Sequence, residues 1–432
     1  MRRRRSSGTT AAGVAFLAFA CALAAAEPPA IVPTSQPAAG SDWPQWRGPT
    51  GCGNTRDASL PVSWGGKEGA NVLWKAELPS TAGISPSSPI VVGESVIVTT
   101  SLDKPAIEHH VVCYSRKDGK LLWQTPVAPG PIKQIDARAS SAAPTPCSDG
   151  QSVFALFGSG VLAAVDLKDG REKWRQELKD TAFDCVIGNS PILCAGSVLF
   201  VADQYKEKSA VYAWDPATGQ LKYQQKRPAE TFCHSTPIVV KMEGKEQVIY
   251  AGNKALQGLD PLTGKVLWWV SGQPGQWMGE SASPAFGGGL IYSDNGRGNG
   301  GAAYQPGGAG DLTQTAVRAR FPCKSDIGSP IIVGEYVYRN IGDQVQCMEL
   351  RTGKMVYTQP LKGIHAWASP VATADRLYFA TAGKSYVFTA GPKFELLGEG
   401  DLGDSNAASP AVSAGRLFLK GTKHLWCVGE EK

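Results

Sequence analysis

The strongest constraint on the fold is a short phrase, small residues followed by proline and an apolar run, that occurs eight times. Consecutive copies lie 40 to 55 residues apart, as in "SSPIVV", "STPIVV" and "GSPIIV". Repetition at this period is typical of architectures in which each unit buries its apolar face only against its neighbours. The marker prolines are Pro89, Pro144, Pro191, Pro237, Pro284, Pro330, Pro370 and Pro410.

A second phrase, D-x-x-T-G, follows within most units and predicts a tight turn between two strands. In "DPATG" (215–219) the Asp215 carboxylate can accept bonds from nearby backbone N–H groups, and Gly219 suits a position with positive φ. A large aromatic residue stands four positions after each such glycine. We predict that these rings pack against the neighbouring unit; the alternative is a stacking platform for a ligand. They are Trp123, Trp174, Tyr223, Trp268 and Tyr357.

Four predicted strands per unit at this period indicate a β-propeller blade, so we predict an all-β, eight-bladed propeller of four-stranded blades. A linear stack would need capped ends. Here the eighth unit stops after its third strand, "KHLWCVG" (423–429), and "NVLWKAEL" (71–78) precedes the first unit. We predict that this N-terminal strand closes the ring, with Trp74 as the missing aromatic, because closure removes an open sheet edge.

The N-terminus has the features of an export signal. Arg2–Arg5 precede a small and apolar run at 11–26, and Ala24–Ala26 offers an A-x-A cleavage site. We predict a signal peptide at 1–26, a Pro/Ala-rich linker at 27–41 and the propeller at 42–432. The expected location is the periplasm or cell envelope. A permanent membrane anchor and a lipoprotein through Cys21 are the alternatives.

Charge and cysteine content exclude several classes of protein. The formal charge of +5 falls to +1 once the four N-terminal arginines are removed, which argues against nucleic acid as a partner. Among the ten cysteines there is no C-x-x-C pair for a metal or redox site and no C-x-x-C-H for haem. Cys113, Cys347 and Cys427 occupy one equivalent place in their units, which predicts a buried strand position.

The repeats resemble the PQQ-like β-propeller repeat family over residues 42–432. Its docking motif, A-x-D-x-x-T-G-x-x-x-W, is matched by Ala213, Asp215, Thr218 and Gly219, with Tyr223 for tryptophan. The opening "DWPQWRGPTGCGNT" (42–55) is similar to the N-terminal signature of exported members. The family contains quinoprotein dehydrogenases, which bind pyrroloquinoline quinone and calcium, and non-catalytic BamB-like scaffolds that bind proteins.

The chain departs from the dehydrogenase pattern, because it has no adjacent cysteines and its blades are short. G-x-S-x-G and H-E-x-x-H motifs are absent too. We therefore expect a non-catalytic scaffold of the BamB-like type, with no catalytic residues, no metal and no cofactor. The alternatives are a quinone- and calcium-dependent dehydrogenase and a carbohydrate-binding or carbohydrate-active propeller. Its expected partner is an envelope protein or polysaccharide, and the protein is expected to be a monomer.

Chemically diverse residues lie shortly before seven of the eight marker prolines, where the chain enters the innermost strand. We predict that they line one mouth of the channel and form the binding site: Arg138, Asn189, His234, Glu280, Asp326, Trp367 and Asn406. Unit five also departs from the repeat, with the Gly-rich stretch 287–313. We interpret this stretch as a flexible surface insertion, with a phosphate loop or calcium site as alternatives.

Overall fold

The computed structural model describes residues 42–431 except 80–85, 103, 133–138, 180, 184–185, 229–230, 243, 253–254, 273–281, 295–298 and 325, together with Met1 and the backbone of Val32–Pro33. The predicted signal peptide and nearly all of the predicted linker fall outside this range. The described chain consists of strands and their connections. It contains no helix long and apolar enough to cross a bilayer.

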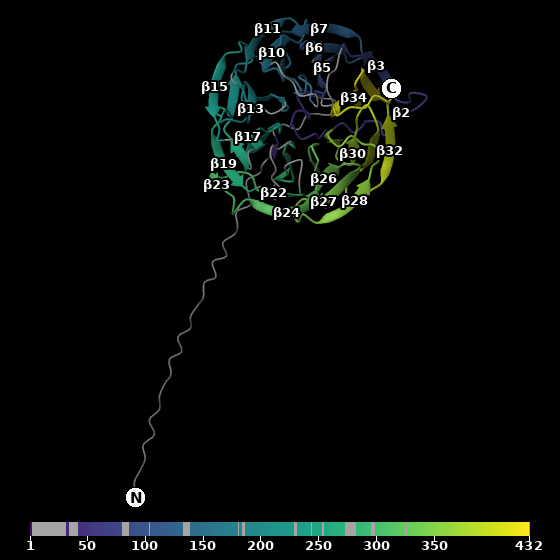
Figure 1. Ribbon diagram of the computed structural model, residues 1–432. Coiled ribbons are helices and arrows are strands. Elements are labelled where there is room, and N and C mark those ends of the chain that lie inside the picture. Colours follow the sequence, from purple (N-terminus) through teal and green to yellow (C-terminus); the bar gives the residue numbers. More distant parts are fainter. Residues whose placement is uncertain are drawn as a thin grey trace.

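Eight four-stranded antiparallel sheets surround a common axis (Figure 1) and confirm the predicted eight-bladed propeller. Blade 1 contains β4 (Ile90–Val92), β5 (Ser95–Leu102), β6 (Glu108–Ser115) and β7 (Leu121–Val127), and blade 2 contains β8 (Cys147–Ser148), β9 (Ser152–Phe157), β10 (Val161–Asp166) and β11 (Glu172–Glu177). Blade 3 contains β12 (Ile192–Cys194), β13 (Ser197–Ala202), β14 (Ala210–Trp214) and β15 (Leu221–Lys226), and blade 4 contains β16 (Ile238–Met242), β17 (Lys245–Gly252), β18 (Ala255–Leu259) and β19 (Val266–Ser271).

Blades 5 to 8 follow the same order from the axis outwards. Blade 5 contains β20 (Ala285–Gly287), β21 (Leu290–Asp294), β22 (Asn299–Tyr304) and β24 (Val317–Lys324), and blade 6 contains β25 (Ile331–Val333), β26 (Tyr336–Ile341), β27 (Gln344–Glu349) and β28 (Met355–Pro360). Blade 7 contains β29 (Val371–Ala372), β30 (Arg376–Phe379), β31 (Ser385–Thr389) and β32 (Leu396–Asp401), and blade 8 contains β33 (Ala411–Ser413), β34 (Arg416–Lys420), β35 (His424–Gly429) and β3 (Val72–Glu77). Three short strands add to blade edges: β1 (Val32–Pro33), β2 (Trp64–Gly65) and β23 (Gly310–Asp311).

The ring is closed as predicted, by the N-terminal strand in the last blade. β3 pairs antiparallel with β35, and Trp74 lies opposite Cys427 in the register. The Trp74 ring is 8% exposed and lies 6.0 Å from Phe418, centroid to centroid. Closure therefore joins residues 72–77 to the C-terminal end of the chain, and the outer edge of β35, the third strand of blade 8, is paired with β3.

The residue before each marker proline forms part of a closed hydrogen-bonded belt. Its backbone N–H donates to the side-chain hydroxyl of the equivalent residue in the next blade, with N–O distances of 2.8 to 3.0 Å. The eighth blade donates back to the first, so the belt has no end. Its members are all buried: Ser88, Thr145, Ser190, Thr236, Ser283, Ser329, Ser369 and Ser409.

The hydrogen-bonded belt shows that one marker proline was assigned to the wrong position in the sequence. In blade 2 the proline equivalent to the others is Pro146, since Thr145 occupies the belt and β8 begins at Cys147. Pro144, the marker read from "AAPTPC", lies two residues too early. Both prolines follow small residues, and only the contacts with blades 1 and 3 distinguish them.

Replacing Ser190 with alanine should lower the free energy of unfolding by about 1–3 kcal/mol, because the buried N–H of Thr145 would lose its acceptor. Ser190→Thr keeps the hydroxyl, and threonine already stands at two belt positions, so this variant should be close to wild type. Urea unfolding of both variants measures the difference. Equal loss in the two would show that packing, and not the hydrogen bond, matters at this position.

The D-x-x-T-G turns hold adjacent blades together through the aromatic residue of the preceding blade. The indole N–H groups of Trp74, Trp123 and Trp174 donate to the turn carbonyls of Arg116, Leu167 and Pro216, each in the next blade, at 2.9–3.1 Å. The Tyr223 hydroxyl donates to the Pro261 carbonyl in the same way at 2.7 Å. Each ring lies against the glycine of that turn, so each turn both reverses the chain and receives the neighbouring ring.

Gly219→Ala should destabilise the protein more than Gly196→Ala, although both glycines have φ near +70°. A Cβ atom on Gly219 would lie 2.5 Å from the Trp174 ring, whereas one on Gly196 would meet nothing within 4 Å. Both variants carry the backbone strain of about 1 kcal/mol, and overpacking adds about 1–3 kcal/mol at Gly219 alone. Thermal or urea unfolding gives the comparison, and equal losses would contradict the packing role of the glycine.

The other two aromatic residues of the series lie in different surroundings. Trp268 is fully buried and donates to Gln247 Oε1 in its own blade, while β23 pairs alongside it in parallel. Tyr357 lies 5.9 Å from Phe394, which belongs to the "AGPKFELL" segment of blade 7. The next blade lacks the D-x-x-T-G turn in both cases, so these rings pack on other residues.

The Gly-rich stretch of unit five, predicted to be a surface insertion, is one only in part, because two of its segments form regular strands of blade 5. Residues 290–294 and 299–304 of this stretch form the strands β21 and β22 of blade 5, and the added chain lies between Tyr304 and Val317. This added chain places β23 against β19 of blade 4, and Tyr304 and Ala316 are buried in the core between blades 4 and 5. The insertion therefore covers a sheet edge of the neighbouring blade.

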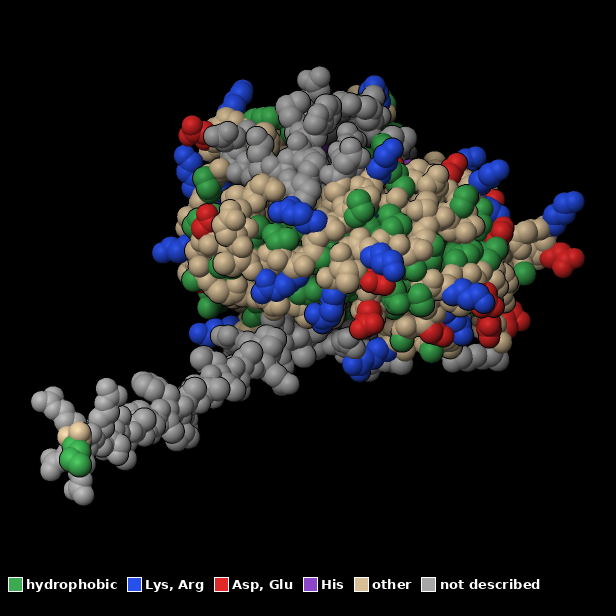
Figure 2. Space-filling view, turned by 90° about the horizontal axis from the view of Figure 1, so that it is seen from below, with side chains coloured by type: hydrophobic (Ala, Val, Ile, Leu, Met, Phe, Trp, Pro, Cys, Tyr) green, Lys and Arg blue, Asp and Glu red, His purple; other side chains and the backbone are tan. Residues whose placement is uncertain are grey.

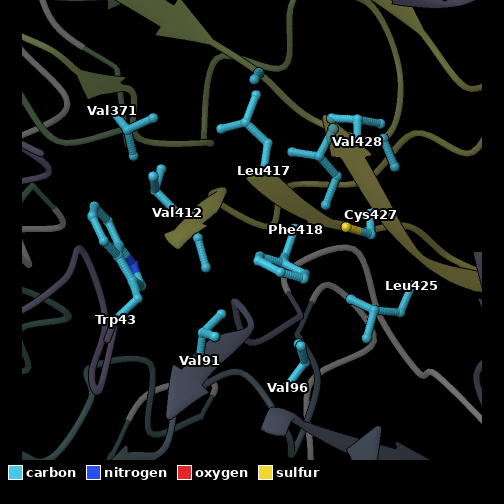
Figure 3. Close-up of a cluster of buried hydrophobic side chains, with 14 of the residues drawn as sticks. Trp43, Val91, Val96, Val371, Val412, Leu417, Phe418, Leu425, Cys427 and Val428 are labelled. Atoms are coloured by element: carbon cyan, nitrogen blue, oxygen red, sulfur yellow. The ribbon is translucent and has the colours of Figure 1, made fainter. Parts of the chain in front are cut away.

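Residues 43–57, here called the ring segment, lie near the axis (Figure 1) and contact the eight blades in order. Figure 3 shows Trp43, at the start of the ring segment, beside Val91 of blade 1 and Val412 of blade 8. Trp43 contacts Val91 of blade 1, Pro44 contacts Ser148 of blade 2, and Gln45 contacts Leu193 of blade 3. Gly51 lies against Ile238 of blade 4, and Cys52 packs with Phe286 of blade 5. Asn54, Thr55 and Asp57 then contact Ile332 of blade 6, Ala372 of blade 7 and Gly415 of blade 8.

Arg47 anchors the middle of the ring segment. Its Nη2 donates to the carbonyls of Cys52 at 2.9 Å and Pro330 at 2.6 Å, and the side chain is 1% exposed. Burial lowers the pKa of this guanidinium to about 10 despite the nearby Cys52 thiol. The ring segment as a whole thus fastens one end of the channel to every blade, and Arg47 of the "DWPQWRG" signature adds a contact with blade 6.

Candidate functional site

The propeller has two ends of different construction. The loop face is the end that contains the connections between blades and the connections between the second and third strands of each blade. The turn face is the opposite end, which contains the other turns and the ring segment. Around the circumference, side chains of both charge signs are interspersed (Figure 2). The predicted mouth residues precede the innermost strands, so they belong to the loop face.

The structure places these residues in different environments. Arg138 and Glu280 lie outside the described residues. Asn189 is 1% exposed and its Nδ2 donates to the Val201 carbonyl at 2.6 Å, while Asn406 is 8% exposed and its Oδ1 accepts from Ala408 N. These two asparagines hold their own loops in place. His234, Asp326 and Trp367 remain half-exposed at the mouth.

Asp326, in the connection that leads into blade 6, lies near His365, which shares the connection between blades 6 and 7 with Trp367. The His365 and Trp367 rings lie 5.9 Å apart, centroid to centroid, at 69°, and the backbone N–H of Trp367 donates to His365 Nδ1 at 3.4 Å. Burial lowers the pKa of His365, and the Asp326 carboxylate opposes this effect. His365 was missed in the sequence, although its position two residues before Trp367 places it in the same connection.

A second aromatic group lies across blades 3 and 4. Phe232 is 5.5 Å from Tyr205 and 5.0 Å from His234, and all three rings are half-exposed. His234 packs directly over the Gly188 backbone, where a Cβ atom would lie 2.5 Å from Nδ1. The loop face therefore presents two clusters of aromatic and polar side chains, the surface type that is enriched where proteins bind partners.

Two buried ion pairs lie beneath these clusters. Asp294 on β21 accepts from Arg339 on β26 through both oxygens, at 2.8 and 2.9 Å, which joins blade 5 to blade 6. Burial alone would lower the pKa of Arg339, but the charge and hydrogen bonds of Asp294, with smaller contributions from Tyr292 and Cys323, leave the pKa raised. Arg227 binds Asp203 at 2.8 Å within blade 3 and lies over the Tyr250 ring of blade 4.

Lys420, at the end of β34, is a buried cation that the sequence did not single out. It is 1% exposed, and its Nζ donates to the Thr99 carbonyl at 2.7 Å and to Ser87 Oγ at 3.1 Å. Burial lowers its pKa to about 7. Its position in "RLFLKG" resembles an ordinary strand end, so no local pattern marks it as buried.

The turn face contains a cavity of about 620 Å³ between the ring segment and the first turns of blades 5, 6 and 7. Its lining is Thr50, Cys52, Asn54, Thr55, Arg56, Ala58, Phe286–Gly289, Ile332–Gly334 and Thr373–Asp375. None of the five mouth residues that the structure describes contributes to it. This size lies within the range of small-molecule sites.

Among the described residues, no group of three or more His, Cys, Asp or Glu side chains is arranged to hold a metal ion. Cys113, Cys347 and Cys427 are buried at equivalent registers, each opposite the aromatic residue of its blade, as predicted. Burial raises their thiol pKa values, to about 11 for Cys113 and about 12 for the other two. These thiols serve as small core side chains.

The fold and its docking turns define an eight-bladed propeller of PQQ-like repeats. A family model described as outer membrane protein assembly factor BamB matches residues 66–179 and 158–391, and the chain belongs to this family. The BamB protein of Yersinia pestis is 24% identical over 288 residues, which is 63% of this chain and 70% of that protein.

Two solved structures share the fold. BamB from Moraxella catarrhalis has a TM-score of 0.57 at 14% identity, over 82% of this chain and 98% of its own. Quinohemoprotein alcohol dehydrogenase from Comamonas testosteroni has a TM-score of 0.69 at 13% identity, over 91% of this chain and 82% of its own. At these identities the likeness concerns the fold alone, which a BamB protein and an alcohol dehydrogenase share.

Proposed function

We propose that this protein is a non-catalytic scaffold of the cell envelope that binds a protein of outer-membrane assembly through its loop face. Family membership carries this proposal, because the model and the curated relative that match the chain both describe outer membrane protein assembly factors. The N-terminal arginines and apolar run support export to the envelope.

The loop face is the favoured surface because it presents half-exposed rings to solvent. Phe232 lies in one cluster and Trp367 in the other, and aromatic side chains are enriched among residues that dominate binding energy. The ring segment occupies the axis at the opposite end. A partner bound at the loop face would therefore meet a rigid rim whose blades are fastened together beneath it.

Site-specific photo-crosslinking in the producing cell tests the proposal. A photoreactive amino acid at Trp367 or Phe232 should give adducts with an outer-membrane assembly protein, and the same group at Leu121, exposed on the outer strand β7, should not. Trp367→Ala, with unchanged unfolding, should reduce binding of that partner at least tenfold. Adducts at Leu121 alone would overturn the choice of face.

A second measurement separates the scaffold from an oxidoreductase. Calorimetric titration with pyrroloquinoline quinone and calcium, run beside a dye-linked alcohol oxidation assay, should give no stoichiometric binding and no turnover. Tight binding with turnover would overturn the non-catalytic proposal, whatever the crosslinking shows.

A further inference from the structure

The outer strand of blade 5 carries a line of exposed cations. β24 alternates exposed and buried side chains along its length, so one of its faces is turned away from the core. This face contains Arg318, Arg320 and Lys324, here called the basic stripe. On the opposite face, Ala319 and Phe321 pack in the core with blade 6. β24 lies on the outer rim of the propeller, so the basic stripe is on its circumference (Figure 1).

The basic stripe forms no ion pair with any residue that the structure describes. The outer strands of blades 2 and 3, β11 and β15, show the opposite arrangement, because every cation on them is paired. The pairs are Lys173 with Asp166, Arg175 with Glu172, Lys222 with Asp215 and Lys226 with Glu207. Blade 5 therefore exposes positive charge that equivalent strands neutralise.

The acidic residues that neighbour β24 along the chain are engaged elsewhere. Asp311, Asp326 and Glu349 each accept a hydrogen bond from a backbone N–H or a threonine hydroxyl of their own turn, at 2.7–2.9 Å. Arg318 Nη1 donates to the Thr315 carbonyl at 2.6 Å. This acceptor is neutral, so it positions the guanidinium and leaves its charge in place.

The last turn of blade 6 adds two more exposed cations beside the basic stripe. Gly353 of this turn packs against the backbone of Arg320, where a Cβ atom would overlap the carbonyl oxygen. Arg351 and Lys354 flank this glycine, and neither forms an ion pair with a described residue. Five cations from two blades thus gather on one part of the rim. Figure 2 views the rim from this side and shows Lys and Arg side chains across it.

We propose that the basic stripe binds an extended acidic segment of a partner protein, in which carboxylate side chains alternate along the chain. Side chains two residues apart on one face of an extended chain are separated by about 6.6 Å. The stripe and the segment share this repeat, so carboxylates can meet Arg318 and Arg320 in turn, and guanidinium groups bind carboxylates well. A lipid surface would not require the cations to stand in one line. This surface is separate from the loop face and does not depend on the scaffold function.

Fluorescence anisotropy of the purified protein with labelled peptides tests the basic stripe. A peptide in which glutamate alternates with serine should bind, and its affinity should fall as salt screens the exposed charges. The triple variant Arg318→Gln/Arg320→Gln/Lys324→Gln should bind this peptide about tenfold more weakly, because each exposed ion pair contributes little and three are lost together. The three side chains are exposed, so urea unfolding of the variant should match that of wild type.

Two controls separate the stripe from net charge and from composition. Lys173→Gln/Arg175→Gln/Lys222→Gln removes the same charge from β11 and β15 and should weaken binding less than about twofold. A second peptide carries the same number of glutamates at every third position, which puts successive carboxylates on opposite faces of an extended chain. This peptide should bind several-fold more weakly than the alternating one.

Three outcomes would overturn the proposal. Binding unchanged in the stripe variant would leave protection of an edge strand as the role of these cations. Equal losses in the stripe variant and the charge-matched control, or equal affinity for the two peptides, would show attraction by overall charge without a specific line. Binding to vesicles that contain phosphatidylglycerol, lost in the stripe variant and accompanied by no peptide binding, would assign the surface to a membrane instead.

Discussion

Asp294→Ala is expected to lower the free energy of unfolding by about 3–5 kcal/mol, as is usual when one partner of a buried ion pair is removed. The guanidinium of Arg339 is 0% exposed and would remain without its bidentate partner. The Gly328 and Asp326 carbonyls that also accept from Arg339 carry no full charge. Urea unfolding at neutral pH measures the loss.

The double variant Asp294→Ala/Arg339→Met should recover most of that loss, because it removes both charges and keeps an apolar side chain of similar length. The exposed pair of Lys226 and Glu207 is the control, with side chains 71% and 81% exposed, and Glu207→Ala should change stability by less than about 1 kcal/mol. A double variant no more stable than Asp294→Ala would show that the pair is held for its geometry rather than its charge balance.

Lys420→Met should stabilise the protein most strongly at low pH. The pKa of Lys420 in the folded protein is about 7, below the ordinary value of 10.5, so the unfolded chain binds more protons between these values. The free energy of unfolding contributed by this group therefore rises with pH from about 7 to 10.5. Below pH 7 the buried lysine is charged in both states, and its burial penalty is fully present.

Each unit of pKa difference is worth about 1.4 kcal/mol, so the lowering of the Lys420 pKa from 10.5 to about 7 predicts a gain on the order of 5 kcal/mol for the variant at pH 6 and nothing above pH 10.5. Thr99 and Ser87 also bond each other, which limits what the loss of the amine leaves unsatisfied. Lys423→Met, at an exposed lysine three residues on, should show no such pH dependence. A gain that is constant from pH 6 to 10.5 would contradict the titration.

The sequence determined the architecture because each repeat is specified by local features, namely its turn residues and the spacing of its apolar and aromatic positions. Gly219 can be recognised as a turn glycine from its neighbours alone, and even spacing then places Tyr223 on a fixed face of the following strand. The closing role of residues 71–78 follows from counting strands in the eighth unit. These inferences need only periods and turns, which act over a few residues.

The tertiary structure alone decided which residues meet across blades. Pro144 and Pro146 are equivalent locally, and the belt selects Pro146 because Thr145 reaches Ser88 and Ser190. The "DWPQWRG" signature gives no sign that Arg47 will be buried against Pro330, 283 positions away. The turn-face cavity, too, joins the ring segment to three blades. Such contacts depend on how the ring closes, and no local pattern encodes that geometry.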